Sequence, residues 1–318
     1  MKVKFIKFIN IAMLAGLFLS ACSNDDVDST SRITVPELPN ETSVSEDYWI
    51  YQNLVVPYNM EVKYRWDDSV ADLTKNLIPP RLDYVVPLLS IIKKAWIEPY
   101  QKLSQKGGEE MHFMEKYIPR LFYLIGSVEY NSDGTVTEGS AESGRKIIIN
   151  NVNAFTKDEL IAKYDTLEDT HTFFHVMHHE FAHILNQKKN YDADFKNVTP
   201  SDYTAQWFNE NFMKCRRLGY ISKYSRENPD EDFAEMVAWM LTRTKEDFDK
   251  LIDDPRLPAE AQNKLRRKEE FVRKYFKEAY GIEIYELQAE IMKQVSEIIS
   301  DDYDLFNVPG YTPSITNN

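Results

Sequence analysis

The chain has 318 residues, of which 43% are apolar and 13% aromatic, enough for a sizeable core in one large domain or two small ones. Its 38 basic and 51 acidic residues give a formal net charge of -13. A protein of that charge repels phosphate backbones, so we expect no nucleic-acid partner.

The N-terminus has the features of an export signal. Lys2, Lys4 and Lys7 precede an apolar run that is too short to span a membrane. The run ends in "LSAC", which resembles the lipobox of bacterial lipoproteins, where the cysteine becomes the acylated N-terminus. We therefore expect residues 1–21 to be a signal peptide and Cys22 to anchor the protein to a membrane. An unmodified thiol after an ordinary secretory cleavage site is the alternative.

Residues 22–46 are expected to be a flexible tether, because they are rich in Ser, Thr, Asp, Asn and Pro. The first of them, "SNDD" at 23–26, resemble the short acidic export signal of surface lipoproteins in Bacteroidetes. Together with the lipobox, this predicts a cell-envelope lipoprotein on the outer membrane, exposed at the surface. Residues 47–318 show no internal repeat or second boundary, and we expect them to form one domain and a monomer.

Beyond Cys22 the only cysteine is Cys215, so the folded part can form neither an internal disulfide nor a cysteine-based metal cluster. We expect Cys215 to be buried or a spectator thiol.

Periodicity then predicts the secondary structure in chain order. Residues 84–108 favour a helix, bent or broken at Pro87 and Pro99 and stopped by two glycines. Residues 120–130 and 145–152 are rich in β-branched and aromatic residues and favour neighbouring strands, with a turn signal between them. Further helices are expected at 167–188, 229–243, 245–253, 257–279 and 282–299, with an irregular stretch at 189–206. Strands early and helices late predict the α+β class with a small mixed or antiparallel sheet.

The expected helix at 167–188 carries the pattern His-Glu-x-x-His, with His179, Glu180 and His183. Residues four apart on a helix lie on one face, with Cβ atoms about 6 Å apart, so both imidazoles can bind one zinc ion. Glu180 emerges about 100° around the helix, where it reaches a water on the metal rather than the metal itself.

The alternative is that histidines simply accumulate here, since five of the six lie between residues 171 and 183. Composition predicts roughly 0.01 chance matches to the pattern in a chain of this size, and clustering raises that figure only about tenfold. His175 and His179 are also four apart, but Val176 follows His175, so that register offers no base. We interpret His171, His175 and His178 as polar positions or partners that orient the ligands.

A catalytic zinc site needs a third protein ligand. No histidine follows His183, so the ligand is either a carboxylate or an upstream histidine such as His112. Glu231 and Glu235 lie four apart on the next strongly periodic helix. Glu231 has a competing role, because Asn228, a proline at the first helical position and Glu231 match a capping box. The residues alone leave Glu231 as either a ligand or part of the cap.

The segment "YSRENPDEDFAE", residues 224–235, resembles a motif of the anthrax lethal factor-like peptidases, Tyr-Gly-Arg-x-Asn-x-x-Glu-Phe-Phe-Ala-Glu. With the His-Glu-x-x-His pattern it places residues 171–241 close to the gluzincin metallopeptidases, and the lipobox adds a likeness to zinc-binding peptidase lipoproteins of Bacteroidetes. The resemblance implies a zincin-like domain in which Glu231 is the third zinc ligand and Tyr224 points at the metal. Asp232 departs from the motif, which has an aromatic residue there.

The resemblance implies zinc-dependent hydrolysis of peptide bonds by an endopeptidase that acts on a peptide or protein substrate. Glu180 would be the general base and Tyr224 an oxyanion donor, while Glu235 would hold one histidine by its other ring nitrogen. An extended substrate would pair with an edge of the sheet that contains 120–130 or 145–152. Two alternatives stay open: Tyr224 only packs against the helix, or the protein is an inactive zinc-, glycan- or protein-binding surface lipoprotein.

Overall fold

The computed structural model describes residues 37–69, 74–106, 113–132, 134, 136–137, 139–142, 145–156 and 173–314. The described residues from Pro39 onward belong to one compact unit. The predictions for the signal peptide, Cys22, His112 and His171 lie outside the described residues.

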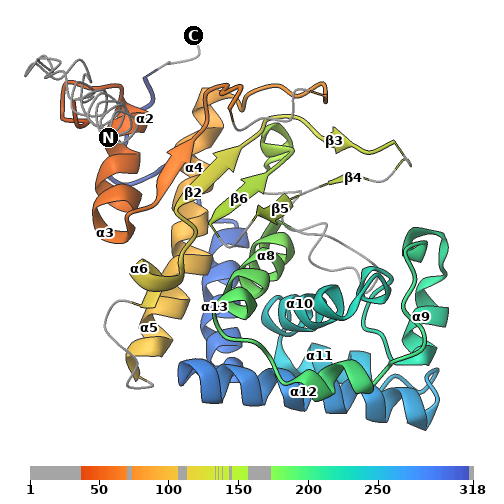
Figure 1. The fold of residues 1–318 in the computed structure, drawn as a ribbon. Helices are drawn as coiled ribbons and strands as arrows, with labels where there is room; N and C mark the ends of the chain where they lie inside the picture. Colours follow the sequence, from red (N-terminus) through yellow and green to blue (C-terminus); the bar gives the residue numbers. More distant parts are fainter. Residues whose placement is uncertain are drawn as a thin grey trace, which may run out of the picture. The chain divides into compact units, whose positions relative to one another are not determined.

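The fold combines many helices with a small sheet, as the α+β prediction requires (Figure 1). The α-helices are α2 (Ser45–Ile50), α3 (Val56–Tyr58), α4 (Leu82–Ile92), α5 (Glu98–Lys106), α6 (Phe113–Tyr117), α8 (Phe173–Lys188), α9 (Phe212–Leu218), α10 (Pro229–Leu241), α11 (Lys245–Ile252), α12 (Ala259–Tyr280) and α13 (Ile284–Ile299). Short π- and 3-10-helical turns are η1 (Tyr51–Val55), η2 (Lys93–Ile97), η3 (Val152–Ala154), η4 (Ala193–Asn197), η5 (Trp207–Asn209) and η6 (Tyr224–Arg226). In the described part of the chain, no helix has both the length and the apolar composition of a membrane span.

Among the described residues, the main sheet has four strands in the order β1-β2-β6-β5. They are β1 (Glu61–Lys63), β2 (Leu121–Leu124), β5 (Gly139–Glu142) and β6 (Lys146–Ile149). Strands β1, β2 and β6 run parallel, and β5 is antiparallel to β6. The prediction that residues 120–130 and 145–152 form neighbouring strands is therefore confirmed. The predicted turn between them lies in a two-stranded ribbon of β3 (Glu129–Tyr130) and β4 (Val136–Thr137).

Neither of the two predicted strand segments is itself an edge of the sheet that contains them. Strand β2 lies between β1 and β6, and β6 lies between β2 and β5. The edges are β1 and β5, which are short and carry polar or small residues, so hydrophobic periodicity does not reveal them. Strand β5 is the edge that contacts α8.

The helix predicted at 84–108 is not broken at either proline. Helices α4, η2 and α5 follow one another from Leu82 to Lys106, and Pro87 lies inside α4. A π-helical turn, Lys93–Ile97, ends just before Glu98 and Pro99. Such a widened turn accommodates the missing N–H and the ring of a proline.

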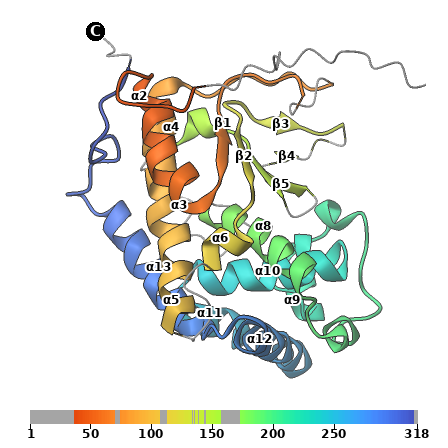
Figure 2. The same ribbon diagram turned by 60° about the vertical axis from the view of Figure 1, so that its left-hand side comes forward.

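Helix α8 lies between the sheet and α10, and both views show this order (Figures 1 and 2). Its apolar side packs against the α4–α5 helix: Phe181 meets Trp96 and Tyr100 edge-on, with ring centroids 5.1 and 5.0 Å apart. Helix α13 contacts η2, α5, α10 and α12. The histidine-bearing helix is thus held on both sides by buried elements, as a rigid site requires.

The C-terminal segment returns to the first described helix. The hydroxyl of Tyr311 donates to Oε1 of Glu46 at 2.7 Å, and the amide of Ser314 donates to the same oxygen at 3.1 Å. Glu46 itself is fully buried. A buried carboxylate with two donors therefore joins the two ends of the compact unit.

Candidate metal centre

Three atoms from two helices meet at one point. Oε2 of Glu231 lies 2.9 Å from Nε2 of His179 and 3.1 Å from Nε2 of His183, and the two ring nitrogens are 3.1 Å apart. Ligands on a tetrahedral zinc with bonds of about 2.0–2.1 Å stand about 3.3 Å from one another. Two nitrogens and one carboxylate oxygen are also the usual ligand types of a catalytic zinc, so these residues fit the ion.

The start of α10 explains how Glu231 reaches α8. The side chain of Asn228 accepts hydrogen bonds from the amides of Asp230 and Glu231, at 2.9 and 3.1 Å, and Pro229 occupies the first helical position. This is the predicted N-cap. The Glu231 carboxylate faces the two imidazoles, so Asn228 makes the cap and Glu231 lies beside the histidines.

Glu235, one turn further along α10, holds His179 from its other side. Its Oε1 lies 2.8 Å from Nδ1 of His179 and 2.8 Å from Nε2 of His175. Its Oε2 accepts hydrogen bonds from Ser222 at 2.6 Å and from Trp239 at 3.2 Å. Four partners fix this buried carboxylate, and it in turn fixes the ring orientation of His179.

His175, His179 and Glu235 form a second group whose atoms also lie close enough to hold a cation. The first group is the better candidate for a catalytic ion. His175 and Glu235 are 2% and 1% exposed, and Glu235 already has four hydrogen-bond partners. If both groups held an ion, His179 would bind one ion through each ring nitrogen, and its imidazole would have to lose the remaining N–H proton.

The pKa shifts of Glu231, His179 and Glu235 all favour the charged forms of these side chains. Burial raises the pKa of Glu231, but hydrogen bonds from His179 and His183 outweigh it and hold that pKa well below its usual range. Burial lowers the pKa of His179, and the hydrogen bonds with Glu231 and Glu235 outweigh it, so the net pKa is raised. Glu235 likewise has a lowered pKa, since its partners outweigh the effect of burial. Two anionic carboxylates therefore flank His179.

Glu180 and Tyr224 both line a cleft of about 550 Å³ next to His179. The Tyr224 ring stacks on the His179 ring, with centroids 5.6 Å apart and planes 27° apart. Burial, followed by the nearby Glu231 charge, raises the pKa of Tyr224, so its hydroxyl keeps its proton as a donor. Tyr224 packs against the helix and also faces the cleft, so the two interpretations of this residue are compatible.

The cleft has walls that sequence reasoning missed. The β3–β4 ribbon contributes Val136 and Thr137, and a loop on the other side contributes Trp207 and Phe208. Trp207 meets the Tyr224 ring at 4.8 Å. The adjacent aromatic residues Trp207 and Phe208 are the one sequence feature that could have indicated this wall, because the stretch around them has no periodicity.

The other two described histidines of α8, His175 and His178, have environments different from those of His179 and His183. His178 is fully buried on the opposite side of α8, where its Nδ1 lies 3.2 Å from the hydroxyl of Tyr100. Burial lowers its pKa to about 3, so it is a neutral core residue. His175 orients Glu235, as described above. Neither belongs to the group formed by His179, His183 and Glu231.

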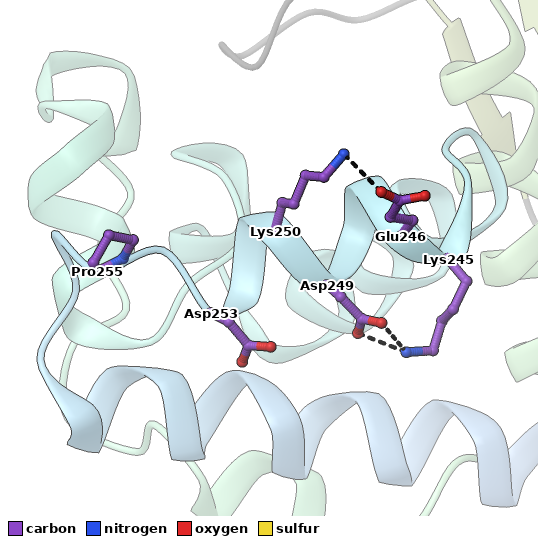
Figure 3. A pocket seen from close by; sticks show the side chains of 6 residues that line it. All are labelled: Lys245, Glu246, Asp249, Lys250, Asp253 and Pro255. Carbon is purple, nitrogen blue, oxygen red and sulfur yellow. Dashed lines mark hydrogen bonds and ion pairs between the residues drawn. The ribbon is translucent and has the colours of Figure 1, made fainter.

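A larger surface hollow, of about 760 Å³, lies along α11 (Figure 3). Its charged side chains pair with one another, Lys245 with Asp249 at 2.5 Å and Lys250 with Glu246 at 3.3 Å. Among the described residues, neither candidate metal-binding group includes a residue of this hollow. The chemistry therefore concentrates at α8 and α10.

The sequence matches a known protein family. Residues 40–285 match a family model described as "Putative zinc-binding metallo-peptidase". The chain belongs to this family. The match spans both helices of the metal centre, and it confirms the family that the sequence motifs indicated. Comparison with curated proteins gives no match.

A solved structure supports the same family. A crystal structure of a "putative zinc-binding metallo-peptidase" from Bacteroides caccae ATCC 43185 is similar to this chain at 31% sequence identity. The similarity has a TM-score of 0.66 and covers 83% of this chain and 95% of the other. The α+β fold is thus that of a metallopeptidase-like protein.

Proposed function

We propose that the protein hydrolyses peptide bonds, as an endopeptidase, with one zinc ion held by His179, His183 and Glu231. The observation that carries the proposal is the convergence of Nε2 of His179, Nε2 of His183 and Oε2 of Glu231 within about 3 Å of one another, beside a cleft lined by Glu180 and Tyr224. Zinc in such a set acidifies water and polarises a carbonyl group.

The residues around the centre divide the remaining work. Glu180 follows His179 directly on α8 and lines the cleft, where it can take the proton of the attacking water and later deliver it to the leaving amine. Tyr224 keeps its proton and can donate a hydrogen bond to the oxyanion that forms from the carbonyl. Glu235 holds His179 so that Nε2 faces His183 and Glu231.

Strand β5 supports a binding mode for an extended substrate. It is an edge of the sheet, it contacts α8, and its first residue, Gly139, lines the cleft. A Cβ on Gly139 would come within 2.4 Å of Val176, so the strand approaches the helix as closely as backbone allows. A peptide that pairs with β5 would run past Glu180 toward the metal-binding atoms.

The test combines metal analysis with digestion of a peptide library by purified residues 23–318. We expect one zinc per chain, cleavage within peptides, and loss of cleavage in Glu180→Gln, a variant that keeps every proposed ligand. One bound zinc without cleavage by the native chain would instead support the alternative of an inactive binding lipoprotein. Absence of zinc binding would exclude the proposed centre.

We also propose that Cys22 anchors the protein to the outer membrane, with the domain at the cell surface. The support is the "LSAC" sequence and the acidic residues that follow it. Labelling with a radioactive fatty acid should mark the native chain and not Cys22→Ser. Protease treatment of intact cells should remove the domain, and a domain protected until lysis would contradict exposure at the surface.

A further inference from the structure

Next to Glu231, on the other side of α10, lies a buried ion pair. Oδ2 of Asp232 is 2.6 Å from Nζ of Lys268 on α12, and both side chains are 0% exposed. Asp232 stands where the lethal factor-like motif has an aromatic residue. An apolar contact between α10 and α12 would fit the resemblance, so the ion pair is a feature of this chain that the motif does not explain.

The pair joins α10 to two segments besides α12. The hydroxyls of Tyr203 and Thr199 donate to Oδ2 of Asp232 at 3.0 and 3.4 Å. Lys268 donates to the carbonyl of Gly219 at 2.8 Å.

The residue after Gly219 closes the cluster. The Lys268 ammonium lies 4.2 Å from the centre of the Tyr220 ring, and the Tyr220 hydroxyl donates to the carbonyl of Thr199 at 3.0 Å. Asp232 therefore accepts hydrogen bonds from the loop that begins at Thr199, and Lys268 contacts Gly219 and Tyr220. Together they connect that loop to the segment that leads into Tyr224.

This loop, residues 199–210, becomes a wall of the cleft. Ala205, Trp207 and Phe208 line the cleft directly. The loop lacks regular structure apart from η5, so its position depends on side-chain contacts. Arg226 provides a second tie, because its guanidinium donates to the carbonyl of Asp202 at 2.6 and 2.9 Å.

We infer that Asp232 and Lys268 form a positioning pair that fixes the loop 199–210 as the substrate-binding wall of the cleft. A buried ion pair adds little to stability compared with apolar residues of similar size, but its directional bonds can select one arrangement. Here those bonds end on Thr199, Tyr203 and Gly219, which flank the wall. The role in binding a peptide rests on the proposed function, whereas the ordering of the loop does not.

Hydrogen exchange in the zinc-loaded full domain tests the ordering. The double variant Asp232→Leu, Lys268→Met replaces both members of the pair by apolar residues, so neither of these two buried charges remains. We expect amide exchange in peptides covering 199–206 to become about tenfold faster or more, with exchange in α8 unchanged. Lys274→Met is the matched control, because it removes another Lys–Asp pair of α12, with Asp192 at 3.2 Å, which is exposed. That control should leave exchange at 199–206 unchanged.

Zinc affinity and kinetics complete the test. Zinc affinity of the double variant should equal that of the native chain, since Glu231 keeps its cap and partners. With a peptide that the native chain cleaves, we expect KM to rise about fivefold or more while kcat stays within about twofold.

Three results would overturn the inference: unchanged exchange at 199–206, equal acceleration throughout α8 and α10, or a fall in kcat at constant KM. If the native chain cleaves no peptide, the proposed function fails, and the exchange experiment still decides whether the pair orders the loop.

Discussion

Nδ1 of His179 lies 2.8 Å from Oε1 of Glu235, on the opposite side of the ring from His183. This carboxylate comes from a different helix and is 1% exposed. It therefore fixes both the rotation of the ring and the nitrogen that faces the proposed zinc. Such partners fix the tautomer and the ring orientation of a metal-binding histidine.

Glu235→Ala should lower zinc affinity by about 10- to 100-fold, because His179 would lose the partner that orients it. Competition with a chromogenic chelator measures the affinity. Ser222→Ala is the control, since it removes only one donor to the far oxygen of Glu235 and should have a much smaller effect. Equal affinities of Glu235→Ala and the native chain would contradict this role.

The histidines of α8 should separate into ligands and core residues. His183→Ala removes a proposed ligand, and we expect zinc content to fall far below one per chain after dialysis. His178→Ala should keep the zinc but lower the free energy of unfolding by about 1–3 kcal/mol, because it leaves the hydroxyl of Tyr100 buried without its partner. Elemental analysis and urea unfolding of both variants provide the measurements, and zinc loss in His178→Ala would be the contrary result.

Tyr224→Phe should reduce kcat by about 100-fold or more while zinc affinity stays the same, since the ring stack on His179 survives and the hydroxyl is lost. Steady-state kinetics on a cleaved peptide measure this. A variant with native kcat would leave Tyr224 with a packing role only.

Lys268→Met alone should be strongly destabilising, by about 3–5 kcal/mol, because it leaves the Asp232 carboxylate buried without a counter-charge. Combining it with Asp232→Leu should recover most of that loss. Urea unfolding at neutral pH compares the three chains. If single and double variants were equally unstable, volume rather than charge would be the cause.

Tyr311→Phe should weaken the protein at neutral pH and not in acid. Burial raises the pKa of Glu46, but hydrogen bonds from Tyr311 and Ser314 outweigh it and the net pKa is lowered. A carboxyl with a lowered folded pKa contributes stability above its unfolded pKa of about 4.3, and the contribution disappears as pH falls through the folded value. We expect a deficit of about 1.5–3 kcal/mol at pH 7 that shrinks below about pH 4. Urea unfolding at several pH values measures it.

Much of the helical part was predictable, and the reason lies in particular residues. Helices α10 and α12 have long amphipathic repeats, and Asn228 and Gly281 mark an end of each. Helix α9 was missed because it has seven residues, although Asn211 caps it and Gly219 adopts φ 97° at its end. Strands β1 and β5 were missed because short, polar edge strands carry no alternation.

The arrangement of the candidate metal-binding residues was predictable in part. Helical spacing alone brings His179 and His183 together, but nothing in local sequence states that Glu231 crosses from another helix. The resemblance supplied that link, and the α8–α10 packing places the carboxylate accordingly. Trp207 and Phe208 could not be predicted as a wall, because the contacts that position their loop involve Asp232, Lys268 and Arg226, all distant in the chain.

The tie between Tyr311, Ser314 and Glu46 also bears on where a recombinant fragment can end. The family match stops at residue 285, yet α13 and the returning segment supply buried groups such as Ile291, Ile298 and Val308. A fragment trimmed to the matched region would expose the faces of α5 and α10 that α13 covers. It would also leave the buried Glu46 carboxylate without the hydrogen bonds from Tyr311 and Ser314. Expression boundaries for this protein are therefore best placed after Ser314.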